Sequence, residues 1–292
     1  MITIIPCNDR LDELVEFVAR INSNGAHHIG FFGEGEADVR ASLAECIVPP
    51  AEGFMMAYDG DRLVGVFGVD ANPEIGRAWL FGPLVDHADW RPVADRLYES
   101  ILPLLSSELR ERDLFCDVQN IHVDEFAARH GFPLRSENAV LTLAREKYTP
   151  SAKRITQVTF YDESLFPQFE RLHNELFPKT YFTAQQIIEK LDSHHKLFLA
   201  LEGEQLLGYH FCKIEPESEL GYVDFIGTDS SARGRGIAAD LLASGVDWML
   251  SAVSTKKVSL TVNADNIPAR KLYEKFGFVV DRIMRGYRKQ VG

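Results

Sequence analysis

The sequence predicts an α/β (α+β) protein built from two similar domains, and three observations support this. Segments with the period of strands alternate with segments with the period of helices along the whole chain, which is typical of helices packed on a sheet. The order of these segments in the first half recurs in the second half. The recurrence keeps a nearly constant spacing, since Gly60 and Gly203 are 143 residues apart and Gly131 and Gly277 are 146 apart.

Composition sets the broad class of the protein. The chain has 292 residues, of which 46% are hydrophobic and 25% are charged, as in globular proteins of about two domains. No apolar run approaches the roughly 20 residues of a membrane span, and no basic leader precedes the first strand. The four cysteines lie far apart without metal-ligand spacing, which favours reduced, mostly buried thiols. We therefore expect a cytoplasmic protein without a membrane partner.

Charge is distributed unevenly between the two halves. Residues 1–150 contain 13 Lys and Arg against 25 Asp and Glu, whereas residues 151–292 contain 18 of each. A nucleic-acid partner needs a basic surface, so the net charge of −12 argues against one. The acidic first half permits a cationic partner or substrate, but solubility is the favoured explanation.

The elements of the first half follow from local patterns. A run of β-branched residues predicts a strand at 1–6, and apolar residues at helical spacing predict helices at 11–18 and 37–47. The segment FMMAYDGDRLVGVFGV predicts a hairpin, because Asp59-Gly60 is a strong turn signal. Similar patterns predict strands at 77–85, 114–118 and 139–145, a helix from about residue 92, and a helix within NIHVDEFAARHGF at 120–132.

The second half repeats this order after the polar linker REKYTPSAKR, which is centred near Thr149-Pro150. Its hairpin is KLFLALEGEQLLGYHFCKI, with Glu202-Gly203 at the turn. The other elements are strands at 154–160, 222–228, 257–262 and 279–289, and helices at 166–176, 184–191, 238–249 and 267–276. We therefore place the two domains at 1–148 and 152–292.

One loop of the second half predicts an anion site. Gly234 and Gly236 interrupt the chain where the helix of IAADLL begins. A glycine-bearing turn at a helix N-terminus leaves backbone N–H groups unpaired, and together with the helix dipole they can hold phosphates. Glycine lets the ligand approach the backbone closely. Arg233 and Arg235 add positive charge at the mouth of this loop.

Two motifs together resemble the GCN5-related N-acetyltransferase (GNAT) family over most of residues 152–292. The first is Arg233-x-x-Gly236-x-Ala238, which fits the pattern Gln/Arg-x-x-Gly-x-Gly/Ala. The second is the downstream helix, which carries Asn266, Ala269, Tyr273 and Gly277-Phe278 in the family's order. The resemblance implies two tandem domains, each with a bent mixed β-sheet flanked by helices, in which the fourth and fifth strands separate and hold acetyl-CoA.

The resemblance also implies roles for individual residues. Main-chain groups of Ile226, Gly227 and Thr228 would pair with the pantetheine arm, and an N–H near Ile226 would stabilise the oxyanion. Asn266 would contact the cofactor arm, and Tyr273 would protonate the leaving sulfur as a general acid. The diphosphate would be held by the backbone amides of Arg233, Gly234, Arg235, Gly236, Ile237, Ala238 and Ala239.

The general base is less well defined by the sequence. Several relatives have Glu eleven residues before the Gln/Arg of the first motif, and that position here is Tyr222. Alternation along a strand puts Tyr222, Asp224 and Ile226 on one face, so Asp224 points into the same cleft. Asp224 is our candidate base. The alternative is that Asp224 has only a structural role, with its carboxylate satisfied by a neighbouring Arg or backbone amide. Glu219, near the strand start, is a weaker candidate.

The first half carries the frame of the second motif without its chemistry. Aligned on Gly131 and Gly277, Ala127 takes the place of Tyr273. Counted from Asp86 and Asp229, residues 90, 93 and 95 (Trp, Val and Asp) take the places of residues 233, 236 and 238. The first domain is therefore predicted to be degenerate and non-catalytic, and to help shape the acceptor site.

The resulting interpretation is an acetyl-CoA-dependent N-acetyltransferase that acts on a primary amine of a small molecule or peptide. A non-catalytic acyl-CoA-binding or scaffold protein and a tandem-GNAT aminoacyl transferase remain alternatives. Phe177, Tyr181 and Phe182 either line an acceptor pocket or pack in the core. Adjacent histidines at 27–28 and 194–195 point apart, so no metal is expected. We expect a monomer or homodimer.

Overall fold

The computed structural model describes residues 1–150 and 155–291 and forms two compact units. Unit 1 consists of Met1–Asn138 and Arg282–Gly292, and unit 2 consists of Ala139–Asp281. These units differ from the expected domains, 1–148 and 152–292, because the C-terminal strand belongs to unit 1 and residues 139–148 belong to unit 2. The expected start at 152, and the linker residues 151–154, lie outside the described residues.

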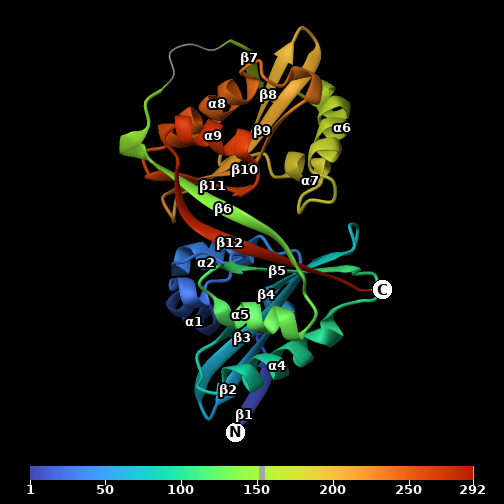
Figure 1. Ribbon diagram of the computed structural model, residues 1–292, viewed down its shortest axis with the longest axis vertical. Coiled ribbons are helices and arrows are strands. Elements are labelled where there is room, and N and C mark those ends of the chain that lie inside the picture. Colours follow the sequence, from blue (N-terminus) through green and yellow to red (C-terminus); the bar gives the residue numbers. More distant parts are fainter. Residues whose placement is uncertain (151–154, 292) are drawn as a thin grey trace. The chain divides into compact units, whose positions relative to one another are not determined.

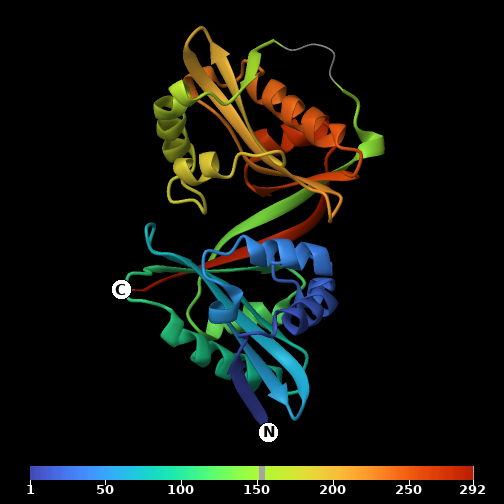
Figure 2. The ribbon, with the colours of Figure 1, turned by 180° about the vertical axis from the view of Figure 1, so that it is seen from behind.

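Unit 1 contains a mixed sheet with the strand order β1-β2-β3-β4-β5-β12 (Figure 1). Its strands are β1 (Ile2–Pro6), β2 (Phe54–Asp59), β3 (Arg62–Asn72), β4 (Arg77–Val85), β5 (Glu111–Asp117) and most of β12 (Val279–Gln290). Its helices are α1 (Leu11–Asn22), η1 (Gly25–His27), α2 (Glu36–Ala44), α3 (Pro50–Gly53), α4 (Trp90–Ile101), η2 (Leu102–Leu104) and α5 (Ile121–Arg129). Within this unit, α4 and α5 lie on one face of the sheet and α1 and α2 on the other (Figures 1 and 2).

Unit 2 repeats this arrangement with the strand order β6-β11-β10-β9-β8-β7. Its strands are β6 (Leu134–Ala144), β7 (Gln157–Phe160), β8 (His195–Glu202), β9 (Gln205–Glu215), β10 (Leu220–Thr228) and β11 (Lys257–Asn263). Its helices are η3 (Arg145–Lys147), η4 (Glu163–Leu165), α6 (Phe166–Leu176), α7 (Ala184–Glu189), η5 (Ser230–Ala232), α8 (Ile237–Ser251) and α9 (Ile267–Lys275).

The predicted elements are present, with shifts at their ends. The helix expected from about residue 92 begins at Trp90, and the strand expected from 139 begins at Leu134. The short helix Pro50–Gly53 was not predicted from the sequence, since its four residues are too few for a periodic signal. Of the four cysteines, Cys46 is half-buried and the other three are buried, and all four are free thiols.

Helices cover both faces of the unit 2 sheet. Along β9, the ring of Tyr209 packs on Phe169 of α6 at a centroid distance of 5.0 Å. The next residue, His210, points to the opposite face, where its Nδ1 lies 2.9 Å from the carbonyl oxygen of Leu241 in α8. Successive side chains of a strand alternate between faces, so α6 and α8 enclose the sheet from opposite sides.

The two central parallel strands of each unit separate partway along their length. In unit 2, β10 pairs with β11 only from Leu220 to Val223, although β10 continues to Thr228. In unit 1, β4 pairs with β5 only over residues 77–79, although β4 continues to Val85. The bent, opening sheet that the sequence led us to expect is therefore present twice.

Strand β12 is held in unit 1 by ion pairs as well as by strand pairing. The guanidinium of Arg288 lies 2.6 Å from a carboxylate oxygen of Asp113 and 3.0 Å from one of Glu111. Arg285 pairs with Asp124 of α5. The Arg288 side chain is only 12% exposed, so removing it would cost more than breaking a surface ion pair, because it leaves poorly solvated carboxylates with one partner fewer.

Deletion of residues 282–292 is expected to unfold unit 1 selectively. The deletion removes the strand next to β5 and leaves the carboxylates of Glu111 and Asp113 without their Arg288 partner. Hydrogen exchange should show amides of β5 losing protection while those of β8 and β9 keep it. As a control, residues 1–138 joined to 282–292 through a Gly/Ser linker should fold, whereas 1–138 alone should not. Full protection of β5 after deletion would contradict this assignment of the strand.

Candidate functional site

A cleft of about 780 Å³ opens in unit 2 where β10 and β11 separate. Most of the residues singled out from the sequence line it. They are Asp224, Ile226, Gly227, Thr228, Arg233, Gly234, Gly236, Ile237, Ala238, Ala239, Asn266 and Tyr273. Arg235 does not line the cleft. The cleft therefore joins the loop before α8, the separated end of β10 and one side of α9.

The loop before α8 presents its backbone N–H groups to this cleft. Gly234 and Gly236 have φ values of +77° and +84°, which side-chain-bearing residues rarely adopt. Gly236 is the N-cap of α8, and its carbonyl accepts from the N–H groups of Ala239 and Asp240. Within residues 1–150 and 155–291, no acceptor is found for the N–H groups of residues 234–238. Consecutive unpaired N–H groups at a helix N-terminus are suited to bind phosphate.

The two arginines of this loop have different surroundings. The guanidinium of Arg235 forms an ion pair with Glu202, so its charge is already engaged. The side chain of Arg233 is exposed, and it pairs with no carboxylate in the described part of the chain. The expectation that both arginines add positive charge at the mouth is therefore corrected to Arg233 alone, because Glu202 at the β8–β9 turn neutralises Arg235.

Asp224 occupies a special position in β10. Val223 pairs with Cys212 and Phe225 with Phe211, so Asp224 is the extra residue of a β-bulge. The hydroxyl of Tyr181 donates to its carboxylate at 3.0 Å. The bulge thus places Asp224 on the wall of the cleft at the point where β10 leaves β11.

The other two candidates for the base are placed differently. The hydroxyl of Tyr222 is engaged with Oγ1 of Thr261 at 3.0 Å. Glu219 precedes β10, carries an exposed carboxylate paired with Lys256, and does not line the cleft. Of the three acidic or hydroxyl groups considered along this segment, only Asp224 faces the cleft.

Tyr273 lies on the α9 side of the cleft and is 6% exposed. Its ring packs edge-on against Phe278 at a centroid distance of 5.9 Å. Burial raises the pKa of the Tyr273 hydroxyl to about 12. No hydrogen-bond partner for this hydroxyl occurs among the described residues. A protonated hydroxyl without a protein acceptor can donate its proton to a ligand.

Asn266 has a structural role that the sequence did not separate from a binding role. It is the N-cap of α9, and its side-chain oxygen accepts from the N–H of Ala269 at 3.2 Å. Asn120 caps α5 in the same way through Val123. The asparagine therefore recurs in both halves because it starts the same helix. The Nδ2 group of Asn266 remains available to the cleft.

The end of α6 forms a wall of the cleft that the sequence indicated only in part. Phe177 was a candidate for the acceptor side, whereas Leu176 had no such signal, because its apolar spacing fits an ordinary core position. Both residues line the cleft. Of the other two aromatic candidates, Tyr181 contacts Asp224, and Phe182 does not line the cleft.

In unit 1 part of the corresponding opening is occupied by the chain itself. Ile29 forms an antiparallel bridge with Cys116 of β5, and the N–H of Gly30 donates to the carbonyl of Phe115 at 2.8 Å. Since β12 takes the other edge of β5, with Arg285 opposite Cys116, this segment lies on the edge that faces β4. Residues 28–30 thus occupy the edge that is left open in unit 2.

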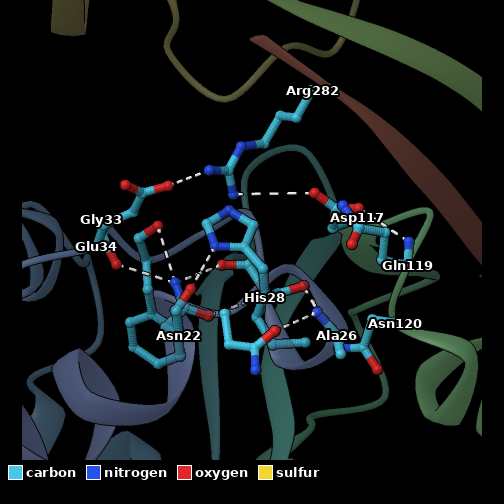
Figure 3. A network of polar contacts seen from close by, with 12 residues as sticks. Asn22, Ala26, His28, Gly33, Glu34, Asp117, Gln119, Asn120 and Arg282 are labelled. Carbon is cyan, nitrogen blue, oxygen red and sulfur yellow. Dashed lines mark hydrogen bonds and ion pairs between the residues drawn. The ribbon is translucent and has the colours of Figure 1, made fainter.

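Polar contacts hold this segment in place (Figure 3). Asn22 donates from Nδ2 to the carbonyl of Gly33 at 2.9 Å and accepts at Oδ1 from the N–H of Ile29 at 2.7 Å. The N–H of Asp117 donates to the carbonyl of His28 at 3.1 Å. Four of these five residues are buried, so the closure of unit 1 is part of its core.

The loop before α4 also differs from its counterpart in length. It spans residues 86–89, whereas the loop between β10 and α8 spans residues 229–236. The expected one-to-one replacement of residues 233, 236 and 238 by 90, 93 and 95 is therefore wrong, because all three lie inside α4. The Trp90 ring stacks on His122 at 4.8 Å, and Asp95 pairs with Arg129. The shorter loop of unit 1 contains no counterpart of Gly234 and Gly236.

Two general features of the described residues concern metal ligands and membrane-spanning helices. No group of three His, Cys, Asp or Glu side chains among residues 1–150 and 155–291 is arranged to hold a metal ion. Across the same residues, the structure has no helix with the length and apolar character needed to cross a membrane.

Comparison with known proteins assigns the second half to a family. Residues 161–278 match the model of the Acetyltransferase (GNAT) family. The mycothiol acetyltransferase of Gordonia bronchialis is 37% identical over 102 residues, which cover 32% of this chain and 32% of that protein. The mycothiol acetyltransferase of Corynebacterium glutamicum strain R is 40% identical over 79 residues, covering 27% of this chain and 26% of that protein. The chain thus spans about a third of the length of these relatives or less.

Solved structures match the whole chain in fold. A GCN5-related N-acetyltransferase from Sphaerobacter thermophilus superposes with a TM-score of 0.73 at 14% identity, covering 99% of this chain and 95% of that one. A tandem GNAT protein from the clavulanic acid biosynthesis pathway superposes with a TM-score of 0.71 at 16% identity, covering 100% and 99% of the two chains. At these identities the match establishes the arrangement of two such folds in one chain.

The buried hydroxyl of Tyr273 predicts a pH dependence of stability. Its pKa in the folded state, about 12, is above its ordinary value near 10, so the folded state binds this proton more tightly. The stability it contributes is fully present below pH 10 and is lost as the pH rises from 10 to 12. In urea unfolding across this range, the wild type should lose more unfolding free energy than Tyr273→Phe. Parallel curves for the two proteins would show that Tyr273 is not shifted.

Proposed function

The chain belongs to the Acetyltransferase (GNAT) family, in the tandem arrangement of two such folds, and we propose that it is an acetyl-CoA-dependent N-acetyltransferase. We place its active site in the cleft of unit 2. The observation that carries the proposal is the run of open N–H groups at residues 234–238, next to a separated strand edge and a buried tyrosine hydroxyl.

The cofactor would lie along the cleft as an extended chain. The N–H groups of residues 233–239 would bind the diphosphate at the N-terminus of α8. The edge of β10 from Asp224 to Thr228 has no β11 partner, so it can pair with the amides of the pantetheine arm as a strand would. Asn266 would donate to the same arm from Nδ2. The acyl end would then lie near the bulge at Asp224, in the cleft that Tyr273 also lines.

The reaction would be direct attack of an amine on the thioester carbonyl. As the carbon–nitrogen bond forms, the carbonyl oxygen gains negative charge, which the N–H near Ile226 would stabilise. The carbon–sulfur bond then breaks and the thiolate takes a proton from Tyr273. Its raised pKa keeps Tyr273 protonated at neutral pH, as a general acid requires.

Asp224 is the residue we propose to deprotonate the amine. Its position at the bulge puts the residue on the wall of the cleft, and the Tyr181 hydroxyl would orient its carboxylate. The proton passes from the attacking amine to this carboxylate, directly or through water. Tyr222 would not take this role, because its hydroxyl is engaged with Thr261.

The acceptor is proposed to be a primary amine of a small molecule or peptide. The carboxylate of Asp224 favours a cationic acceptor, which would lose its proton on binding. A screen for the acceptor should include the amine acceptor of the relatives named mycothiol acetyltransferase. It should also include polyamines, aminoglycosides, amino acids and peptide N-termini. In unit 1, residues 28–30 pair with β5 on the edge that faces β4, and we propose that this unit has a supporting role without turnover.

Calorimetry with acetyl-CoA should detect one site per chain. Gly236→Glu should abolish binding, because it adds a carboxylate to the cradle and a side chain at φ +84°. Gly203→Glu is a matched control: it adds the same charge at an open turn with φ +60°, where no atom lies within 4 Å of the position that a Cβ would take. Absence of acetyl-CoA binding to the wild type would contradict the proposed function, as would binding that survives Gly236→Glu.

Kinetics with an acceptor found by the screen should separate the two catalytic residues. Tyr273→Phe is expected to lower kcat by about 100-fold or more, with acetyl-CoA affinity nearly unchanged, because only proton donation is lost. Asp224→Asn should remove the acidic limb of the pH–rate profile. Turnover of Tyr273→Phe equal to wild type at every pH would exclude Tyr273 as the acid, and an unchanged acidic limb would exclude Asp224 as the base.

A further inference from the structure

The C-terminal end of α6 lies directly on the backbone of β10 inside the cleft. The Cδ1 atom of Leu176 lies 2.6 Å from the position that a Cβ on Gly227 would take, and Cε2 of Phe177 lies 3.5 Å from it. Contacts this close leave no channel between α6 and β10 at this point. Gly227 directly follows Ile226, whose N–H we propose for the thioester oxygen, so this contact borders the acyl end of the donor.

Phe177 is fixed by an aromatic cluster on its far side. Its ring packs edge-on against Phe225 at a centroid distance of 5.1 Å, and lies 6.0 Å from His173 and 6.3 Å from Tyr209. Phe225, His173 and Tyr209 are all 2% exposed or less. The buried neighbours therefore restrict the motion of the Phe177 ring on the side away from the cleft.

Hydrogen bonds also fix the end of α6. The two ring nitrogens of His173 lie 2.6 Å from the hydroxyl of Tyr209 and 2.9 Å from the carbonyl oxygen of Phe182. These contacts connect α6 to β9 and to the segment before α7. The wall formed by Leu176 and Phe177 is therefore held from the sheet and from the loop, and is rigid rather than adaptable.

Other residues line the remaining sides of the cleft near the acyl end. Val223 and Leu260, which are 4% and 1% exposed, form the floor where β10 and β11 meet. Tyr273 closes the side of α9. The next lining group is the carboxylate of Asp224, which is polar and hydrogen-bonded by Tyr181. An alkyl chain that extended beyond the acetyl methyl group would approach the Phe177 ring or Asp224, whose polar carboxylate disfavours apolar contact.

We propose that Leu176 and Phe177 restrict the donor to short acyl groups, so that acetyl-CoA is accepted and butanoyl-CoA and longer acyl-CoA thioesters are rejected. This proposal rests on the proposed function and names the acyl class of that same site. It also assigns to the wall a selective role that is independent of the acceptor.

Calorimetric titration of the full chain with CoA, acetyl-CoA, butanoyl-CoA and octanoyl-CoA tests the proposal without an acceptor. Wild type should bind CoA and acetyl-CoA within a few-fold of each other, and butanoyl-CoA about 10-fold more weakly or worse. Leu176→Ala and Phe177→Ala should each reduce this difference in affinity between acetyl-CoA and butanoyl-CoA to a few-fold. Phe166→Ala is the matched control, because Phe166 packs on the same core from the first turn of α6 without lining the cleft, and it should keep the gap.

The outcomes separate this inference from the proposed function. Absence of CoA binding to the wild type would contradict the function itself. Equal binding of acetyl-CoA and butanoyl-CoA by the wild type would overturn the proposed selective role of Leu176 and Phe177 and would leave the proposed function intact. Binding of free CoA reports whether each variant is folded, and if Phe177→Ala fails this check, Phe177→Leu and Leu176→Ala carry the test. A gap that persists in folded variants of both wall residues would also overturn the proposal.

Discussion

The separation of two parallel strands is the constraint on which the rest of the site depends. After Val223, β10 leaves β11, and the bulge at Asp224 marks the point of departure. Separation leaves a strand edge without hydrogen-bond partners, which is costly unless another chain or ligand satisfies it. In unit 1 the segment around Ile29 satisfies the equivalent edge of β5. In unit 2 the edge opens on a cleft that the N–H groups before α8 and the hydroxyl of Tyr273 share.

The position of the C-terminal strand in unit 1 explains part of the acidic excess of the first half. The acidic excess of the first half suggested either solubility or a cationic partner. Residues 282–292 carry four Lys and Arg and no Asp or Glu. Three of these basic residues form ion pairs within unit 1, among them Arg288 with Asp113 and Glu111. Part of the acidic excess is therefore matched by a basic strand of the same chain, an arrangement visible only once the units are known.

The fold class and the family resemblance were predictable from sequence, and both are confirmed by the family match and the tandem structures. They were predictable because hydrophobic period, turn residues and glycine positions are local properties. The unit boundaries could not be predicted, since no local signal shows that the C-terminal strand pairs with the first half of the chain. Nor could the pairing of Arg235 with Glu202, which joins residues distant in sequence. Leu176 was missed for a related reason: its spacing on α6 is that of any core residue.

The sequence by itself determined the order of elements, the two glycines at positive φ before α8, and the loss of the tyrosine at Ala127. Each follows from the chemistry of one residue or the period of one segment. Tertiary structure decided which clefts are open. Unit 2 opens because nothing in the described chain pairs with β10 beyond Val223 on the β11 side, whereas unit 1 closes because residues 28–30 pair with β5. Strand pairing joins residues far apart in the chain, and its partners are set by packing rather than by local pattern.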